Sequence, residues 1–168
     1  QSADGVRWSE PRLVVRVPNH QAVSPAIVRR SSGDWLMWTV NAGAVGCAGS
    51  STTIERRRST DGLTWSSPVA VSLEQPGAVP WHLDVQWIPS RNEFWALYNA
   101  KIAGSCTTDA LYLATSADGL TWTTFPSPVL RRGAIPELGD IVYRSTFAYD
   151  ADRDLVSLAF RPGQDGGS

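Results

Sequence analysis

Three short stretches of this chain hold side chains that could exchange protons or bind a flat ligand: Trp81-His-Leu-Asp84, Ile135-Pro-Glu-Leu-Gly-Asp140 and Tyr143-Arg144. Carboxylates and imidazole act as general acids and bases, and two carboxyl groups in different environments can divide these roles between them. Aromatic rings add flat apolar faces, and arginine adds a permanent positive charge. The candidate residues are therefore Trp81, His82, Asp84, Glu137, Asp140, Tyr143 and Arg144.

The elements that must position these residues belong to a repeat. Nearly the same seven residues, Ser-x-Asp-Gly-x-x-Trp, stand at 2–8, 59–65 and 116–122, each copy beginning 57 residues after the one before. A fixed period of this size is typical of arrays whose units bury their faces against neighbours. The Ser and Asp side chains can accept hydrogen bonds from turn amides, Gly allows a positive φ, and Trp can pack beneath the turn. We therefore predict a structural role for Asp4, Asp61 and Asp118.

The apolar runs between these turns predict four short strands per repeat. The first two form hairpins over residues 26–40, 85–98 and 147–160, and equal spacing predicts the same hairpin register in all three. Third strands are predicted at 53–58 and 110–115, and fourth strands at 12–17, 69–73 and 127–130. Radially repeated four-stranded antiparallel sheets define the β-propeller, so we predict an all-β fold of β-propeller blades with a repeat of about 57 residues. Trp35, Trp38, Trp87 and Trp95 lie inside strands and are expected to stack between blades.

Counting strands predicts a single β-propeller fragment over residues 1–168, an incomplete ring of about three blades. Propellers typically close with about four to eight blades, and an open ring leaves strand edges unpaired. The remaining blades are expected to come from sequence outside this chain or from a second chain.

Charge and composition argue against several classes of partner. A net charge of −1 provides no basic field for nucleic acid and no polybasic patch for a membrane surface. No apolar run is long enough to span a bilayer. We therefore predict neither a nucleic acid nor a membrane partner. Lys101 is the only lysine, and the sequence indicates no structural reason for it.

The two cysteines, Cys47 and Cys106, lie in the loops between the second and third strands of consecutive repeats. These loops should lie at the same level on adjacent blades, so a disulfide between them is predicted, which implies an oxidising compartment and a secreted or cell-surface protein. No His or Cys cluster has metal-ligand spacing, and the sequence predicts no metal and no cofactor. The charged run at 55–58 is expected to form a solvated edge or an ion-pair network.

The repeat resembles those of two related groups of enzymes. The Ser-x-Asp-Gly-x-x-Trp turns are similar to those of the five-bladed propeller glycosidases, which include arabinanases, β-xylosidases and fructosidases. They are more distantly similar to the Asp-boxes of sialidases, which are one residue longer. The resemblance covers essentially the whole chain. It implies a glycoside hydrolase that acts on an oligo- or polysaccharide through carboxylates in a central funnel; the alternatives are a lectin-like propeller and a protein-interaction scaffold.

The resemblance also assigns roles to the candidate residues. In those enzymes the working carboxylates stand at the start of innermost strands, where this chain has Asp84. The implied pair is Asp84 as base or pKa-tuning partner and Glu137 as acid, while Trp81, His82, Asp140, Tyr143 and Arg144 would bind the sugar. The alternative is that these residues only link neighbouring blades. The first repeat departs from the family pattern, since it has Ser24-Pro25 where an Asp is expected.

Overall fold

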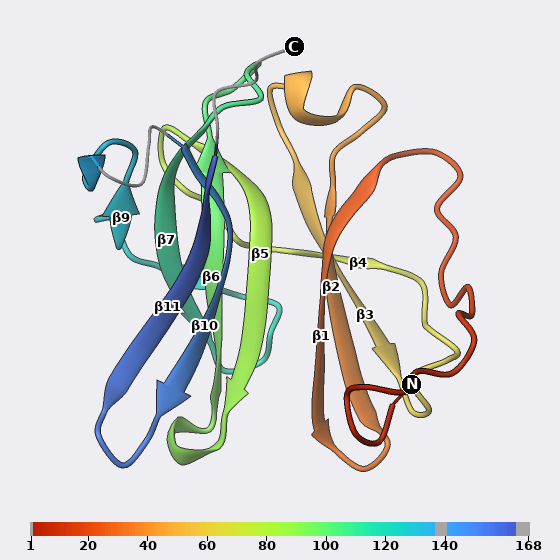
Figure 1. Cartoon of the computed structure of the whole chain (residues 1–168). Coiled ribbons are helices and arrows are strands. Elements are labelled where there is room, and N and C mark those ends of the chain that lie inside the picture. The colour runs from red at the N-terminus through yellow and green to blue at the C-terminus, as the bar shows by residue number, and fades with distance from the viewer. Residues whose placement is uncertain (1, 137–140, 164–168) are drawn as a thin grey trace.

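The computed structural model describes residues 2–136 and 141–163 and shows three antiparallel units side by side (Figure 1). The first sheet contains β1 (Ala22–Ser31), β2 (Asp34–Asn41), β3 (Thr53–Ser59) and β4 (Val69–Val71) in that order. The second contains β5 (Val79–Ile88), β6 (Glu93–Lys101), β7 (Thr108–Ser116) and β8 (Thr123–Thr124), with β9 (Leu130–Arg131) also paired to β7. The third is the hairpin of β10 (Ile141–Asp150) and β11 (Leu155–Gly163). The predicted all-β fold of an incomplete propeller ring is confirmed: the first sheet has four strands, the second has four in order with β9 added, and the third unit is described as a hairpin.

The rest of the described chain consists of loops and two 3-10 turns, Gly46–Ala48 and Pro89–Arg91. Among the described residues, no helix is long and apolar enough to span a membrane. The innermost strands of the three units, β1, β5 and β10, pack against one another in sequence order, with β5 in the middle. This contact brings the corresponding ends of the three repeats together.

The prediction of one hairpin register is wrong for the first unit. In the second and third units the hairpins turn through four residues each, 89–92 and 151–154. Trp87 therefore pairs with Phe94 in the same register in which Tyr149 pairs with Val156. In the first unit Ser31 pairs directly with Asp34, and the register shifts between Arg29 and Ser31. Gly33 has φ of +74°, which allows this tighter turn, and the bulge absorbs the change in length.

Two of the predicted fourth strands also differ. Residues 12–17 form no strand, because no third strand lies beside them in the described chain; instead Leu13, Val14, Val15 and Val17 line a cavity of about 310 Å³ against the first sheet. The stretch at 127–130 is split into β8 before it and β9 at its end. Pro126 and Pro128 have no N–H for a sheet ladder, which explains the interruption.

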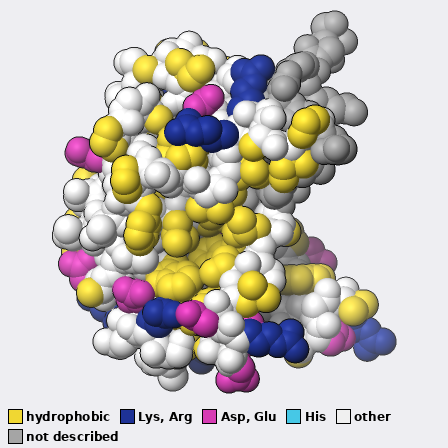
Figure 2. Space-filling model, turned by 90° about the vertical axis from the view of Figure 1, so that its left-hand side faces the viewer, with side chains coloured by type: hydrophobic (Ala, Val, Ile, Leu, Met, Phe, Trp, Pro, Cys, Tyr) yellow, Lys and Arg dark blue, Asp and Glu magenta, His cyan; other side chains and the backbone are white. Residues whose placement is uncertain are grey.

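Aromatic side chains join the units, as predicted for Trp38 and Trp95. Trp38 is fully buried; its ring lies 5.3 Å from Phe94 of β6 and 6.2 Å from Trp122 in the turn that precedes β8. Trp95 lies 4.8 Å from Tyr149 of β10. Figure 2 shows hydrophobic side chains gathered in a hollow on the side of the molecule where β7 and β9 lie in Figure 1.

Trp35 and Trp87 make other contacts. Trp87 pairs with Phe94 of its own sheet at 4.7 Å. Trp35 stacks with the guanidinium of Arg29, 5.3 Å from the ring centroid. The prediction that strand tryptophans stack between units therefore does not describe Trp35, whereas Trp87 also lies 5.3 Å from the guanidinium of Arg30 in the first sheet.

The three repeated turns form the same hydrogen bonds. In each, the Asp Oδ1 accepts two backbone N–H groups, at 2.9 and 2.9 Å for Asp4, 2.7 and 2.7 Å for Asp61, and 2.8 and 2.9 Å for Asp118. These bonds lower the pKa of all three carboxyl groups. The predicted structural role of these Asp residues is confirmed.

The Trp residues of the turns have different environments. Trp122 is 7 % exposed, whereas Trp8 is 71 % exposed and its indole N–H donates to Gly5 at 3.1 Å. In the described chain Trp8 does not pack beneath its turn, so the prediction of packing there is not met at this copy.

The charged run at 55–58 forms an ion-pair network, as expected. Glu55 and Arg57 are buried and paired at 3.0 Å on the face of the first sheet turned away from the second. Arg56 donates to the Asp118 carbonyl at 2.7 Å and so links the two sheets.

Cys47 and Cys106 form the predicted disulfide, with Cα atoms 4.8 Å apart, between the β2–β3 loop and the β6–β7 loop. Lys101 strengthens the same junction, because its ammonium donates to the Gly49 carbonyl at 2.6 Å. Lys101 is 0 % exposed, so the single lysine has a structural position that the sequence did not indicate.

Candidate functional site

Each of the three inner strands is interrupted near the same end. The register shifts between Val23 and Ala26 in β1, between Pro80 and Leu83 in β5, and between Tyr143 and Ser145 in β10. Two bulge residues that are not glycine have positive φ, Ser24 at 52° and Arg144 at 46°. Bulges redirect side chains, and strained backbone of this kind is concentrated at functional sites. We refer to Ser24, Trp81, His82, Tyr143 and Arg144 as the bulge site.

His82 is the centre of the bulge site. It is 5 % exposed, and its ring lies 4.8 Å from the Tyr143 ring and 5.5 Å from the Trp81 ring. Its Nδ1 forms a hydrogen bond with the Ser24 hydroxyl. Its Nε2 is buried and has no hydrogen-bond partner among the described residues. The ring is therefore held on one side and unsatisfied on the other.

Burial and charge keep this imidazole neutral. Desolvation, and then the positive charge of Arg144, lower the pKa of His82 from 6.5 to about 4. Arg144 is exposed, and its guanidinium lies 5.8 Å from the Tyr143 ring centroid. On the other side, the Lys101 ammonium lies 5.7 Å from the Trp81 ring, and burial lowers the pKa of Lys101. A neutral imidazole thus lies within an aromatic cluster that has a cation at each end.

Asp84 lies two residues further along β5. Its Oδ2 accepts a hydrogen bond from the Thr146 hydroxyl at 2.7 Å and one from the Gln86 amide at 3.4 Å. The Gln86 amide also donates to the Phe147 carbonyl. Asp84 is therefore a half-buried carboxylate at the junction of β5 and β10. Its neighbour Thr146 occupies the equivalent position in the next repeat.

The structure brings together Trp81, His82, Tyr143 and Arg144, which the sequence singled out because they break the repeat. Glu137 and Asp140 lie outside the described residues, so the separation of the predicted Asp84–Glu137 pair stays a prediction. Two contributors were missed, Ser24 and Lys101. Ser24-Pro25 also breaks the repeat, but the sequence pattern identifies it only as the position where an Asp is expected and absent.

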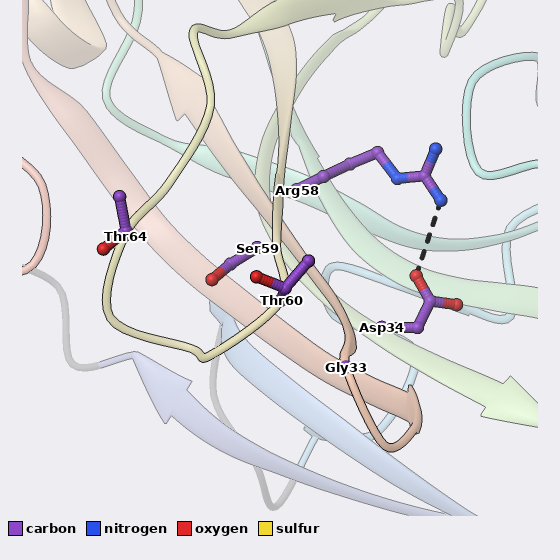
Figure 3. A pocket seen from close by; sticks show the side chains of 6 residues that line it. All are labelled: Gly33, Asp34, Arg58, Ser59, Thr60 and Thr64. Atoms are coloured by element: carbon purple, nitrogen blue, oxygen red, sulfur yellow. Dashed lines mark ion pairs between the residues drawn. The ribbon is translucent and has the colours of Figure 1, made fainter.

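A polar cavity lies away from these residues. It has a volume of about 300 Å³ and lies between the β1–β2 turn and the repeated turn that follows β3 (Figure 3). Arg58 and Asp34 form an ion pair of 3.5 Å across it. The described residues contain no cluster of three or more His, Cys, Asp or Glu side chains arranged as metal ligands. The bulge site is the place where the unusual residues of the repeat converge.

Comparisons with known proteins agree with this architecture. No protein-family model matches the chain. Over 141 residues the chain is 34% identical to the A type blood N-acetyl-alpha-D-galactosamine deacetylase of Flavonifractor plautii, a match that covers 78% of this chain and 18% of the relative. The crystal structure of an N-acetylgalactosamine deacetylase from F. plautii, in complex with blood group B trisaccharide, is similar with a TM-score of 0.72 and 29% identity. That match covers 89% of this chain and 46% of the solved chain.

More distant structures share the fold alone. The Bacillus subtilis arabinanase has a TM-score of 0.54 at 19% identity and is matched over 48% of its length. The fructofuranosidase of Schwanniomyces occidentalis has a TM-score of 0.63 at 12% identity and is matched over 33% of its length. The chain thus spans less than half of each of these solved relatives, as expected for an incomplete ring. It has the β-propeller fold of the arabinanase- and fructosidase-like glycosidases that its sequence repeat resembles.

Proposed function

We propose that this chain is part of a carbohydrate-active enzyme that removes the acetyl group from an N-acetylated amino sugar. The observation that carries the proposal is the match to the F. plautii proteins: 34% sequence identity to one described as a deacetylase, and a TM-score of 0.72 to a structure described in the same way. The more distant neighbours, an arabinanase and a fructofuranosidase, support the broader class of carbohydrate-active enzymes.

The bulge site has groups suited to amide hydrolysis. The neutral His82 has a free Nε2 that can take a proton from an attacking water. The water oxygen bonds to the acetyl carbon, the carbon–nitrogen bond breaks, and the same proton is returned to the leaving amine. The products are acetate and the free amino sugar. The Arg144 guanidinium can stabilise the negative charge that develops on the carbonyl oxygen.

Tyr143 and Asp84 would bind the sugar. Tyr143 is half-buried and offers part of its ring, while the Asp84 carboxylate can accept a hydrogen bond from a sugar hydroxyl. Trp81 is 8 % exposed, so it is suited to packing against the His82 ring and holding that ring in place.

A second candidate function is glycoside hydrolysis, with Asp84 as base and Glu137 as acid. The arabinanase and fructofuranosidase folds favour it, and so does the position of Asp84 on an inner strand. This reaction requires the two carboxyl groups about 5–5.5 Å apart for retention, or about 6.5–9.5 Å apart for inversion.

One assay distinguishes the candidates. The protein that carries this chain is incubated with an oligosaccharide ending in α-linked N-acetylgalactosamine, and acetate, free amine and released sugar are measured separately. Acetate and amine in equal amounts are expected. Release of an intact sugar would identify a glycoside hydrolase instead, and binding without any product would identify a lectin-like propeller. The variant His82→Gln should abolish acetate release.

We also propose that the protein works in an oxidising compartment, at the cell surface or after secretion. The Cys47–Cys106 disulfide supports this location, because such bonds persist where thiols are not kept reduced. Further blades, from additional sequence or a second chain, would complete the ring around the site.

A further inference from the structure

Ser24 and His82 join two units of the propeller at the centre of the bulge site. The Ser24 hydroxyl and the His82 Nδ1 are hydrogen-bonded, although they come from β1 and β5 and lie 58 residues apart. Ser24 is half-buried and His82 is 5 % exposed, so little water reaches the contact. A hydrogen bond in such surroundings fixes the orientation of the imidazole ring.

The backbone at Ser24 adopts a costly conformation. Its φ is 52°, a region that residues other than Gly, Asn and Asp seldom occupy, and it lies within the bulge of β1. Strain of this kind persists only where the surrounding structure enforces it. Here the strained backbone accompanies the contact between the Ser24 hydroxyl and the His82 ring of the neighbouring sheet.

The position of the proton on His82 follows from what surrounds each nitrogen. A neutral imidazole carries one N–H, and a serine hydroxyl can accept or donate. If the proton were on Nε2, it would be a buried donor without a partner, which is rarer in proteins than an unsatisfied acceptor.

We propose that Ser24 is a positioning residue: it accepts a hydrogen bond from Nδ1–H of His82, which leaves the unpartnered Nε2 without a proton. The use of that nitrogen as a base rests on the proposed deacetylation. The placement of the proton does not depend on it.

Nitrogen NMR of the imidazole tests the placement directly. The chain has only two histidines, so His20→Gln leaves the His82 signals alone in the spectrum. In this background we expect a proton on Nδ1 and none on Nε2 at neutral pH. Ser24→Gly removes the hydroxyl without backbone strain, because glycine readily adopts this φ, and should give a mixture of the two ring forms. Ser24→Asn tolerates the same φ and offers an amide oxygen, so it should restore the single form.

Two results would overturn the proposal: a proton on Nε2 in the parent protein, or the same ring form in Ser24→Gly as in the parent. Dispersed backbone amide spectra of both variants establish that they fold. In the enzymatic assay, Ser24→Gly should lower kcat about 10-fold or more with little change in KM, and Ser24→Asn should recover most of it. If the NMR results hold and no acetate is released by the parent protein, the positioning role stands and the proposed function fails.

Discussion

The environment of His82 determines its chemical character more than its residue type does. An exposed histidine is partly charged near neutral pH, whereas His82 is buried between two aromatic rings and close to Arg144. Both effects disfavour the imidazolium. The result is a neutral group with one hydrogen-bonded and one unpartnered nitrogen, which can accept a proton but is a weaker base than an exposed histidine.

The lowered pKa of His82 predicts how stability depends on pH. Because the folded pKa is about 4 and the ordinary value is 6.5, the unfolded chain binds a proton more readily than the folded one. The contribution of His82 to the free energy of unfolding should therefore be constant above pH 6.5 and should fall as the pH decreases from 6.5 to about 4. Urea denaturation at several pH values measures this slope. The variant His82→Gln should flatten it, and an unchanged slope in that variant would contradict the assignment.

The predicted carboxylate pair, Asp84 and Glu137, makes a separate prediction about activity. If the second candidate function holds, Asp84→Asn and Glu137→Gln should each lower kcat by about 10²–10⁴-fold, because removing a positioned acid or base has this effect. Thermal unfolding of each variant should remain close to that of the parent protein. Acetate release that is unaffected by Glu137→Gln would instead favour the His82-centred reaction.

At the scale of elements, one turn sequence is used in three different surroundings. The Ser-x-Asp-Gly turn keeps its hydrogen bonds in every copy, since these involve only neighbouring residues. The packing differs, because it depends on the sheet next to each turn. Gly119 lies against the fully buried Trp38, which donates to its carbonyl at 2.9 Å, whereas Gly5 has open space around it.

This difference predicts unequal effects of the same substitution. Both glycines have positive φ, 74° for Gly5 and 71° for Gly119. Gly5→Ala should therefore cost about 1–2 kcal/mol from backbone strain alone. Gly119→Ala places its Cβ 2.7 Å from the Trp38 ring and should cost about 1–3 kcal/mol more from overpacking. Equal losses in urea denaturation would show that Trp38 does not constrain the turn.

The last residue of the turn provides a second matched pair. Trp122 is 7 % exposed and packs on Trp38, while Trp8 is 71 % exposed. Trp122→Ala should lower the free energy of unfolding by about 3–5 kcal/mol, because a large buried ring leaves a cavity. Trp8→Ala should change it by less than about 0.5 kcal/mol. A small loss at Trp122 would mean that the ring does not help to join the two sheets.

At the scale of the whole molecule, the junction between the first two sheets has two kinds of connection. The aromatic cluster around Trp38 fills the space between them, and the Cys47–Cys106 disulfide with Lys101 ties their loops together. The third unit is joined through Trp95, Tyr149 and the Arg91–Asp154 ion pair. The inner strands are thereby held side by side, and the bulge site depends on that alignment.

Removal of the disulfide should weaken this alignment. The bond closes a loop between residues 59 positions apart, so its loss restores chain entropy to the unfolded state. The double variant Cys47→Ser with Cys106→Ser should lose about 2–4 kcal/mol of unfolding free energy. Reductant should lower the stability of the parent protein and leave the variant unchanged, which distinguishes loss of the bond from damage caused by the serines.

The sequence alone determined the repeat and the strands of its hairpins, but not every fourth strand. Apolar alternation and turn residues act between near neighbours, so they are visible in a single chain and predicted β1, β2, β5 and β6 well. The same spacing placed Cys47 and Cys106 at one level, and they are bonded. Residues that broke the repeat, such as His82 and Tyr143, marked the inner ends of the strands before any contact was known.

The tertiary structure alone decided which of those residues meet. The bulges in β1, β5 and β10 each change the side to which the following side chains point, and no periodicity records where one extra residue is inserted. Ser24 meets His82 only because adjacent sheets pack at a particular angle and depth. Lys101 lies near Trp81 within the second sheet, where the bulge of β5 is beside the end of β6. Contacts between units depend on that packing, which is a property of the assembled sheets and not of any one segment.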